Sequence, residues 1–390
     1  MPEHGALRSL FLLRADVIFL NHGSFGATPR PVFQEYQRWQ LELERQPVEF
    51  LGRQFEGLMA RARSVLADYV QAGPDELVYV PNATTGLNVV ARSLALQPGD
   101  EVLATDHEYG ALDRTWRFIC AKRGAVYRQV PVPVPVTTHA DFVERFWSSV
   151  TPRTRAIFLS HITSPTALIF PVKEICRRAR EAGIISIVDG AHALGQIPLD
   201  LSDLGADFYS SNAHKWLLAP KGSAFLYARR ERQYLVEPLV VSWGWKSERP
   251  SKSRFIDEQE WQGTRDIAAY LSVPAALEFT REHDWDRVRE ECHDLACYAR
   301  RQVSALTGLE PLSPDAPEWF AQMLSLPLPP CDGEALKARL YDEFRIEVPI
   351  ITWNNHQLIR ISVQAYNIKD DVDALNGALR SLLPQVAKGV

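Results

Sequence analysis

The sequence predicts an α/β fold, with a mostly parallel sheet sandwiched by helices and a smaller α+β domain at the C-terminus. Short apolar runs typical of buried strands alternate with helical stretches over residues 76–227, and this alternation produces parallel strands joined by right-handed crossovers. The chain has 390 residues, too many for one compact core. We expect an N-terminal arm over residues 1–20, a large domain over residues 21–266 and a small domain over residues 267–390.

Composition excludes several functional classes. The chain is 46% hydrophobic and 23% charged, with a formal net charge of −5, so we expect neither nucleic acid nor a membrane surface as a partner. No apolar stretch approaches the roughly 20 residues that span a bilayer, and no signal peptide is recognisable. The five cysteines are irregularly spaced, which disfavours a disulfide framework. We therefore expect a cytoplasmic protein. Cys292, His293 and Cys297 lack a second ligand pair, so no metal is expected.

The N-terminal third begins with an extended run over residues 17–20. It leads into a segment of small residues, Asn21-His22-Gly23-Ser24-Phe25-Gly26. The two glycines permit unusual backbone angles or close approach to a ligand, although a simple loop explains them equally well. Residues 31–70 have a helical pattern that Pro47 interrupts.

A possible anion site follows the first strand of the large domain. We expect a strand over residues 76–80, a small polar turn over residues 81–86 and a helix over residues 87–94. The free N–H groups at a helix N-terminus attract anions, and the hydroxyls of Thr84 and Thr85 add donors. A helix cap without a ligand is the alternative. Two adjacent hydroxyls favour phosphate.

Further buried strands are expected over residues 100–105, 125–130 and 155–160. The first ends in a loop that contains His107 and Tyr109. Either ring could stack on the aromatic face of a cofactor, and either could equally be an ordinary loop residue.

The central observation is an acid at the end of a buried strand and a lysine just past the next one. The apolar run over residues 183–188 stops at Asp189, and a strand over residues 207–210 leads to Lys215. Pyridoxal phosphate chemistry needs a lysine that forms a Schiff base and a carboxylate that keeps the pyridinium nitrogen protonated. Taken alone, the acid is more often a helix cap and the lysine a solvated charge.

The remaining sequence disfavours other classes of cofactor site. No G-x-G-x-x-G follows a strand and no P-loop occurs, which disfavours dinucleotide and nucleotide sites. Residues 223–227 close the series of strands, and residues 267–306 have a helical pattern. Arg360 lies in an apolar strand over residues 358–363. A buried arginine needs an anionic partner, either a substrate carboxylate or an internal salt bridge, and the salt bridge is the commoner case.

The order of these motifs resembles the class V aminotransferase group of fold-type I pyridoxal phosphate enzymes, over nearly the whole chain. Within the group, the segment from Asn21 to Gly26 and the segment from Asp106 to Ala111 look most like the isopenicillin N epimerase-like branch. That branch also resembles cysteine desulfurases and the C–S lyases of ergothioneine synthesis. The motifs are Asn21-His22-Gly23-Ser24, Ala83-Thr84-Thr85, Asp189-Gly190-Ala191-His192, His214-Lys215, Gly263-Thr264 and Arg360.

The resemblance implies a role for each motif. Lys215 would bind pyridoxal 5'-phosphate and move the Cα proton, Asp189 would pair with the pyridinium nitrogen, and His192 would lie near the ring. Thr264 would reach the cofactor of a partner subunit, which implies a homodimer with shared sites. The residues expected to bind the cofactor are Ala83, Thr84, Thr85, His107, Tyr109, Ser164, Asp189, His192, Asn212, His214, Lys215 and Thr264. The residues expected to bind the amino-acid substrate are Asn21, Gly23, Ser24 and Arg360.

Two departures from the family pattern matter. Residues 345–355 contain no cysteine, so sulfur transfer through a protein persulfide is disfavoured. Glu108 occupies the place where relatives usually have a stacking His or Phe.

We expect an epimerase or racemase that acts at the Cα of an amino acid through a carbanion. A C–S lyase and an aminotransferase are the alternatives, because the fate of the carbanion decides the reaction.

Overall fold

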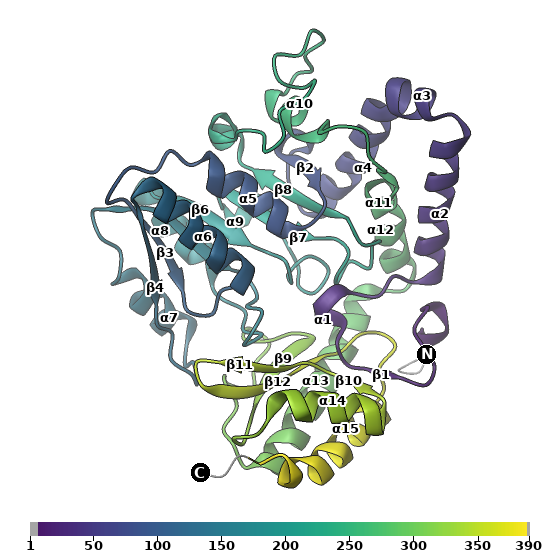
Figure 1. The fold of residues 1–390 in the computed structure, drawn as a ribbon, viewed down its shortest axis with the longest axis vertical. Helices are drawn as coiled ribbons and strands as arrows, with labels where there is room; N and C mark the ends of the chain where they lie inside the picture. Colours follow the sequence, from purple (N-terminus) through teal and green to yellow (C-terminus); the bar gives the residue numbers. More distant parts are fainter. Residues whose placement is uncertain (1–6, 388–390) are drawn as a thin grey trace.

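The computed structural model describes residues 7–387, and residues 1–6 of the expected arm lie outside this range. A seven-stranded sheet forms the centre of the larger part (Figure 1). Six strands run in one direction, which confirms the predicted α/β fold with a mostly parallel sheet. In sheet order the strands are β2 (Leu77–Val80), β8 (Ala224–Ala228), β7 (Phe208–Asn212), β6 (Ile185–Asp189), β5 (Thr154–Ser160), β3 (Glu101–Thr105) and β4 (Val126–Val130).

Strand β8 departs from the predicted parallel series, because it pairs antiparallel with both β2 and β7. The segment between β7 and β8 covers only residues 213–223 and contains no helix. A parallel crossover needs a dozen or more residues, usually with a helix, so this short connection returns the chain in the opposite direction.

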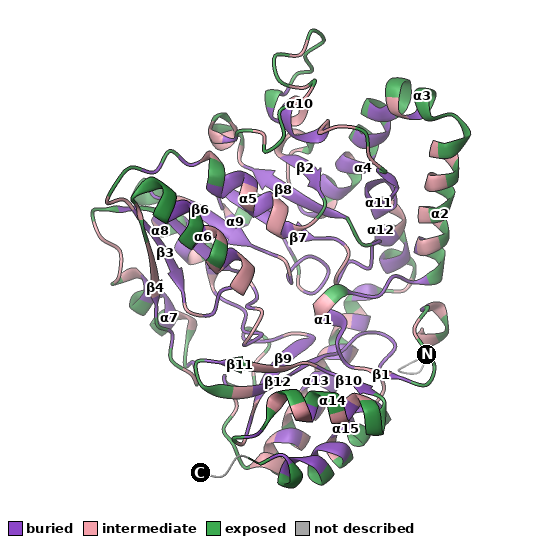
Figure 2. Ribbon diagram, viewed as in Figure 1, coloured by how far each residue is buried: buried purple, intermediate pink, exposed green. Residues whose placement is uncertain are grey.

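Helices cover both faces of the sheet, and the side chains of each strand alternate between two cores. One core contains α5 (Ala83–Ser93), α6 (Gly110–Arg123) and the start of α10 (Arg254–Glu260). Figure 2 shows that the sheet is buried while the outer sides of these helices are exposed. The elements of the opposite face are α4 (Phe55–Tyr69), α7 (His139–Trp147), α8 (Val172–Glu181), α9 (Leu201–Leu204), α11 (Ala268–Leu271) and α12 (Val273–Glu282).

The long N-terminal helical region is broken where Pro47 predicts. Helix α2 (Arg30–Arg45) ends before it, and the short α3 (Pro47–Glu49) and a π-helical turn (Phe50–Gln54) connect α2 to α4. Both α2 and α4 pack against α11 and α12. Short 3-10 turns occupy Arg8–Leu10, Pro74–Glu76, Arg230–Leu235 and Leu383–Gln385.

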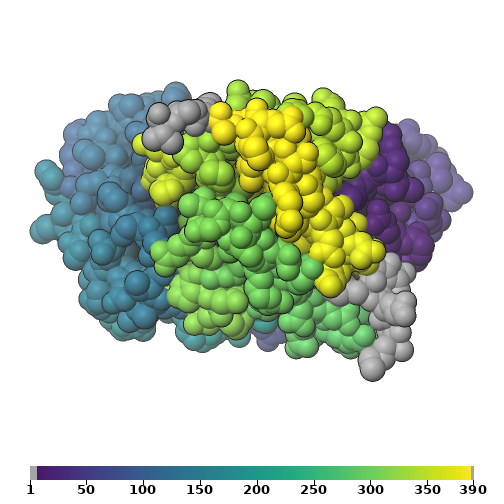
Figure 3. Space-filling view, turned by 90° about the horizontal axis from the view of Figure 1, so that it is seen from below, coloured from purple at the N-terminus to yellow at the C-terminus, as the bar shows by residue number. Residues whose placement is uncertain are grey.

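The C-terminal part contains an antiparallel sheet with the order β11 (Ile350–Trp353), β12 (His356–Ser362) and β9 (Met323–Leu328). Figure 3 shows this part from below, where its green-to-yellow surface covers the middle of the face. Its helices are α13 (Trp285–Thr307), α14 (Gly333–Phe344) and α15 (Lys369–Leu382).

The N-terminal segment joins this C-terminal part. Strand β1 (Ile18–Phe19) pairs in parallel with β10 (Ile346–Glu347), and α1 (His22–Phe25) follows. Contacts therefore cross both proposed domain boundaries, and the division at residues 20/21 and 266/267 stays a prediction. Over residues 7–387, no helix has the length and apolar character needed to cross a membrane.

Candidate active site

The predicted catalytic residues meet at the carboxyl ends of the central strands. Asp189 is the last residue of β6, and Lys215 lies in the loop after β7. The backbone N–H of His161, just past β5, donates to the Asp189 carbonyl at 2.8 Å. Ligands of open α/β sheets bind at this edge. The structure thus brings Asp189 and Lys215 to the place where the sequence predicts a cofactor.

The Lys215 amine lies 3.2 Å from Nε2 of His192, and the lysine as a whole is half-buried. Burial, together with the positive charge of Arg360, lowers the pKa of Lys215 to about 7. Burial also holds the pKa of His192 well below its usual value. Both groups are therefore available in their neutral forms near neutral pH, the form that an amine needs to act as a nucleophile or base.

A neighbouring tryptophan fixes the tautomer of His192. The indole N–H of Trp216 donates to Nδ1 of His192 at 3.3 Å. An indole nitrogen is only a donor, so Nδ1 must accept and Nε2 of the neutral ring must carry the proton. The proton on Nε2 therefore faces the lone pair of the neutral Lys215 amine.

Asp189 has the environment expected of a partner for a pyridinium nitrogen. Its carboxylate accepts a hydrogen bond from the Ala191 N–H at 2.9 Å, and burial raises its pKa to about 6. A buried carboxylate is stabilised when a cation or an N–H donor binds it. A protonated ring nitrogen would supply both, so the donor set fits pyridoxal phosphate.

The anion site at the start of α5 differs in detail from the prediction. The helix begins at Ala83 and not at Leu87, because the Asn82 side chain caps it by accepting from the N–H and hydroxyl of Thr85 at 2.8 and 3.1 Å. The Ala83 N–H donates to the Asn212 side chain at 2.8 Å. Among residues 7–387, the Thr84 hydroxyl has no hydrogen-bond partner, so it is free to bind a phosphate.

His214 lies two residues after Asn212, and its ring forms a hydrogen bond to a backbone carbonyl. Its Nδ1 donates to the Ser223 carbonyl at 2.9 Å, and burial lowers its pKa to about 4. The neutral ring therefore presents a lone pair at Nε2. A phosphate at that nitrogen would favour protonation, because an adjacent anion stabilises the charged ring.

Arg360 is a buried cation without a carboxylate partner. Its guanidinium donates to the Ser164 carbonyl and hydroxyl at 2.7 and 3.1 Å and to the Ser24 hydroxyl at 3.2 Å. Its Nε has no partner, and no ion pair joins it to another residue of the described chain. Burial lowers the pKa of Arg360 to about 10. The internal salt bridge is therefore wrong for residues 7–387, and the charge of the guanidinium is left without an anionic partner in this part of the chain.

The two candidates for ring stacking occupy different environments. His107 is fully buried, with its Nδ1 2.7 Å from the Thr166 hydroxyl and its Nε2 2.8 Å from the Val132 carbonyl. Tyr109 precedes α6, is 45% exposed and lies close enough to influence the pKa of Arg360. Of the two rings, that of Tyr109 is exposed and that of His107 is fully buried, and the stacking role of either stays a prediction.

The N-terminal motif touches the site through one of its three predicted residues. Ser24 binds Arg360 and donates to the Asn21 side chain at 2.6 Å. Asn21 in turn donates to Glu347 at 3.0 Å. Gly23 is packed so closely that an added Cβ would lie 2.8 Å from both Met323 and Ser362. Asn21 and Gly23 thus contact other protein groups, mainly of the C-terminal part.

Thr264 lies apart from these residues. It is exposed in the loop between α10 and α11, and it makes no hydrogen bond to the described part of its own chain. Its predicted role toward a partner subunit therefore stays a prediction.

Sequence reasoning missed a buried acid, Glu108. Its carboxylate accepts from the Ser160 N–H and hydroxyl at 2.8 and 2.6 Å and from the Thr105 hydroxyl at 2.6 Å. Burial, with a contribution from Asp189, raises its pKa to about 8. Two acids in one short loop after a strand, Asp106 and Glu108, were the available signal. The role of Trp216 gave no signal, because an aromatic residue beside a lysine usually only packs.

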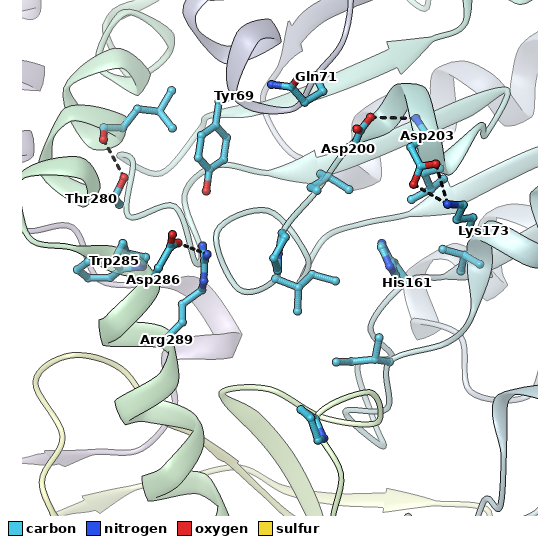
Figure 4. Close-up of a pocket in the computed structure, with 18 of the residues that line it drawn as sticks. Tyr69, Gln71, His161, Lys173, Asp200, Asp203, Thr280, Trp285, Asp286 and Arg289 are labelled. Atoms are coloured by element: carbon cyan, nitrogen blue, oxygen red, sulfur yellow. Dashed lines mark hydrogen bonds and ion pairs between the residues drawn. The ribbon is translucent and has the colours of Figure 1, made fainter.

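One cavity lies away from these residues. It has a volume of about 1190 Å³ and lies between the loop before α9 and the start of α13 (Figure 4). Tyr69, His161, Lys173 and Arg289 are among its lining residues, whereas Lys215 and Arg360 are not. None of the predicted cofactor or substrate residues lines this cavity.

Comparisons with known proteins agree with the geometry. A profile of the aminotransferase class-V family matches residues 27–375. The chain is 37% identical to isopenicillin N epimerase from Amycolatopsis lactamdurans, over 93% of this chain and 94% of that protein. It is 30% identical to putative L-cysteine desulfhydrase 1 from Oryza sativa subsp. japonica, over 95% and 84% of the two chains.

A solved structure extends the likeness to the fold. The apo cysteine desulfurase from Thermococcus onnurineus NA1 matches with a TM-score of 0.83 and 20% identity, over 97% of this chain and 98% of that one. This match confirms the predicted fold-type I architecture. The chain therefore belongs to the aminotransferase class-V family of enzymes, whose cofactor is pyridoxal 5'-phosphate.

Proposed function

We propose that this protein is a pyridoxal phosphate-dependent epimerase or racemase that acts at the Cα of an amino acid. The observation that carries the proposal is the 37% identity to isopenicillin N epimerase over 93% of the chain. The missing cysteine over residues 345–355 supports it, because a persulfide-forming desulfurase would need a nucleophilic thiol there.

Each residue of the site has a separate role in the proposed reaction. When bound, pyridoxal phosphate withdraws electrons from the Cα of an attached amino acid and so makes the α-proton acidic. Lys215 takes this proton as a neutral amine, and His192 holds that amine in place. Inversion at Cα requires that a proton then returns on the opposite face. Arg360 binds the α-carboxylate through its paired N–H groups. Asp189 holds the ring nitrogen, and Tyr109 covers the ring.

The phosphate end uses the start of α5 and the loop after β7. Thr84 offers a free hydroxyl, and the helix N-terminus offers a favourable dipole. The Asn212 side chain accepts from Ala83 through its oxygen, which leaves its amide N–H groups as donors. His214 binds phosphate once it takes up a proton. Ser164 and Ser24 orient the guanidinium of Arg360.

We include a homodimer with shared sites in the proposal. Thr264 is exposed, and the nearby loop that precedes α10 carries Trp243 with 82% of its surface exposed. Large exposed apolar side chains of this kind mark interaction surfaces. A second copy of the chain would cover them and bring Thr264 to the neighbouring cofactor. The cytoplasmic location also remains part of the proposal.

The test separates the possible reactions by their products. The purified protein is incubated in D2O with isopenicillin N, L-cysteine and a panel of L-amino acids, with Lys215→Ala as the control. An epimerase incorporates deuterium at Cα as it forms the opposite configuration. Deuterium incorporation without inversion, for every substrate, would contradict the epimerase proposal.

A C–S lyase is the second candidate. The specific support is the 30% identity to putative L-cysteine desulfhydrase 1 over 95% of the chain. This candidate predicts release of sulfide together with a keto acid and ammonia from L-cysteine. A keto acid that forms only when an amino acceptor is present would instead identify an aminotransferase.

A further inference from the structure

His22 has no assigned role, yet it contacts the catalytic loop directly. The residue is fully buried in α1, which lies between the large sheet and the small sheet (Figure 1). Its Nε2 lies 3.0 Å from the backbone carbonyl of Lys215, and its Nδ1 lies 2.9 Å from the Tyr366 hydroxyl. The ring therefore bridges the lysine loop and the C-terminal part.

The partners fix the direction of both hydrogen bonds. A carbonyl only accepts, so Nε2 of His22 carries the proton and donates to Lys215. Nδ1 then accepts from the Tyr366 hydroxyl. The Gln364 amide nitrogen lies 3.4 Å from the same Nε2, farther than the carbonyl, and it has no lone pair to receive the proton. Burial lowers the pKa of His22 to about 3, so the ring stays neutral in this one tautomer.

The lysine loop needs support from outside itself. Its turn is closed by the Leu218 N–H, which donates to the Lys215 carbonyl at 3.1 Å. Leu218 has a φ of 66°, a left-handed conformation that is costly for a bulky residue. The hydrogen bond from His22 supplies the second donor to that carbonyl, from a different element of the fold.

The backbone around His22 is fitted to the same loop. Gly26 has a φ of 69°, and an added Cβ would lie 2.1 Å from the His214 carbonyl oxygen and 2.9 Å from Cα of Lys215. Two residues earlier, Ser24 accepts from Arg360 at 3.2 Å. One short segment thus touches both the proposed base and the proposed carboxylate clamp.

We infer that His22 is a positioning residue, which holds the backbone of Lys215 so that its amine stays in the buried place beside His192. Tyr366 orients the His22 ring, and α1 thereby couples the C-terminal part to the catalytic loop. This inference rests on the proposed role of Lys215. It predicts that loss of the His22 donor frees the Lys215 amine toward solvent and leaves Arg360, the proposed carboxylate clamp, in place.

Two substitutions separate this role from simple packing. His22→Gln keeps an amide N–H near the position of Nε2, so it can still donate to the Lys215 carbonyl. His22→Asn reaches only the position of Nδ1, so it keeps the Tyr366 partner and loses the donor to Lys215. The two variants differ by one methylene group and are matched in polarity.

The readout is the reactivity of the Lys215 amine. Full-length protein freed of cofactor is treated with cyanate at a series of pH values, and labelling of Lys215 is measured by peptide mass spectrometry. In His22→Asn the Lys215 carbonyl keeps the Leu218 donor and loses the one from His22. The pH midpoint should therefore rise by about one unit, which corresponds to about 1.4 kcal/mol, the size of one hydrogen bond. His22→Gln keeps the donor to Lys215 but lacks the nitrogen that accepts from Tyr366, so its midpoint should rise less than that of His22→Asn. On proposed substrates, kcat should fall about tenfold in the Asn variant and recover in large part in the Gln variant.

Each other outcome decides against the inference. Equal midpoints in all three proteins, or an equal rise in both variants, would overturn it and leave His22 a packing residue. If His22→Asn does not fold, Tyr366→Phe removes only the orienting hydroxyl and should give a smaller rise, and an unchanged midpoint there would overturn the inference as well. Absence of pyridoxal phosphate binding by the wild type would refute the proposed function separately, since the labelling experiment needs no cofactor.

Discussion

The buried guanidinium of Arg360 gives the sharpest prediction about substrate binding. Replacing it by methionine, Arg360→Met, keeps most of the side-chain length and removes the charge and all N–H donors. Charge-assisted hydrogen bonds contribute about 1.5–3 kcal/mol each. Loss of a paired interaction with a carboxylate should therefore cost about 3–4 kcal/mol, which is about 100- to 1000-fold in amino-acid affinity.

The same substitution should leave the fold intact. Arg360 has three hydrogen bonds to two serines, no carboxylate partner among residues 7–387 and an unpartnered Nε. Burial of such a cation opposes folding, and apolar replacements of buried charges are often neutral or stabilising. The thermal midpoint of the unliganded protein should therefore stay the same or rise.

A third effect follows from the electrostatics of the site. The positive charge of Arg360 is the second cause, after burial, of the lowered pKa of Lys215. Removing that charge should raise this pKa above about 7. Because the base must be neutral, the acidic limb of the pH–activity profile should shift to higher pH.

Amino-acid binding is measured by the change it causes in the visible spectrum of the cofactor-loaded protein, and cofactor binding is measured by dialysis. Arg360→Lys keeps the charge without the fork and should show an intermediate loss of affinity and no pH shift. Arg339→Ala changes a surface arginine paired with Glu343 and is the control. Equal loss of amino-acid and cofactor affinity, or loss of neither, would refute a carboxylate clamp.

Three further predictions concern the parts that hold the site. Asn82→Ala removes the cap of α5 and should cost about 1 kcal/mol of unfolding free energy, with weaker cofactor binding by dialysis; unchanged binding would show that the cap does not order the anion site. Gly26→Ala would place a methyl group 2.1 Å from the His214 carbonyl oxygen, so both the thermal midpoint and cofactor affinity should fall, and wild-type values in both measurements would contradict the close packing of Gly26 against the lysine loop. Burial raises the pKa of Glu108 to about 8 in the folded protein. The contribution of Glu108 to stability is therefore complete below the pKa that this group has in the unfolded chain, and it is lost as the pH rises through 8. Glu108→Gln should remove this part of the pH dependence of the unfolding free energy, measured from pH 5 to 9.

The sequence was sufficient for the fold because most strands of this sheet are buried on both faces, the edge strand β4 excepted. Apolar runs such as residues 183–188 mark such strands directly. The parallel direction predicted for β8 was wrong, because a run of apolar residues carries no directional information. Only the length of the segment before it, with no helix, could have indicated a reversal.

The catalytic pair was recognisable because Asp189 and Lys215 each follow a strand. Parallel strands bring such ends together whatever their separation along the chain. The contacts of Trp216 and His22 were not predictable. They depend on which ring nitrogen faces which partner, and His22 reaches Lys215 only after the N-terminal segment has packed against β12 through Asn21.

Arg360 shows a limit of what the sequence can predict about the partner of a buried charge. Its place in an apolar strand predicted burial, and burial favoured an internal salt bridge on general grounds. The structure instead surrounds the guanidinium with serine oxygens. A partner can be excluded only when the surrounding strands and loops are placed, so the sequence left both possibilities open.

The most direct test of the central claim is the visible absorption spectrum of the purified protein with pyridoxal phosphate, recorded beside that of Lys215→Ala. A visible band of the lysine-bound cofactor in the wild type, absent from the variant, is the predicted result. It would identify both the cofactor and the residue that holds it. No band in the wild type, or the same band in Lys215→Ala, would contradict the account.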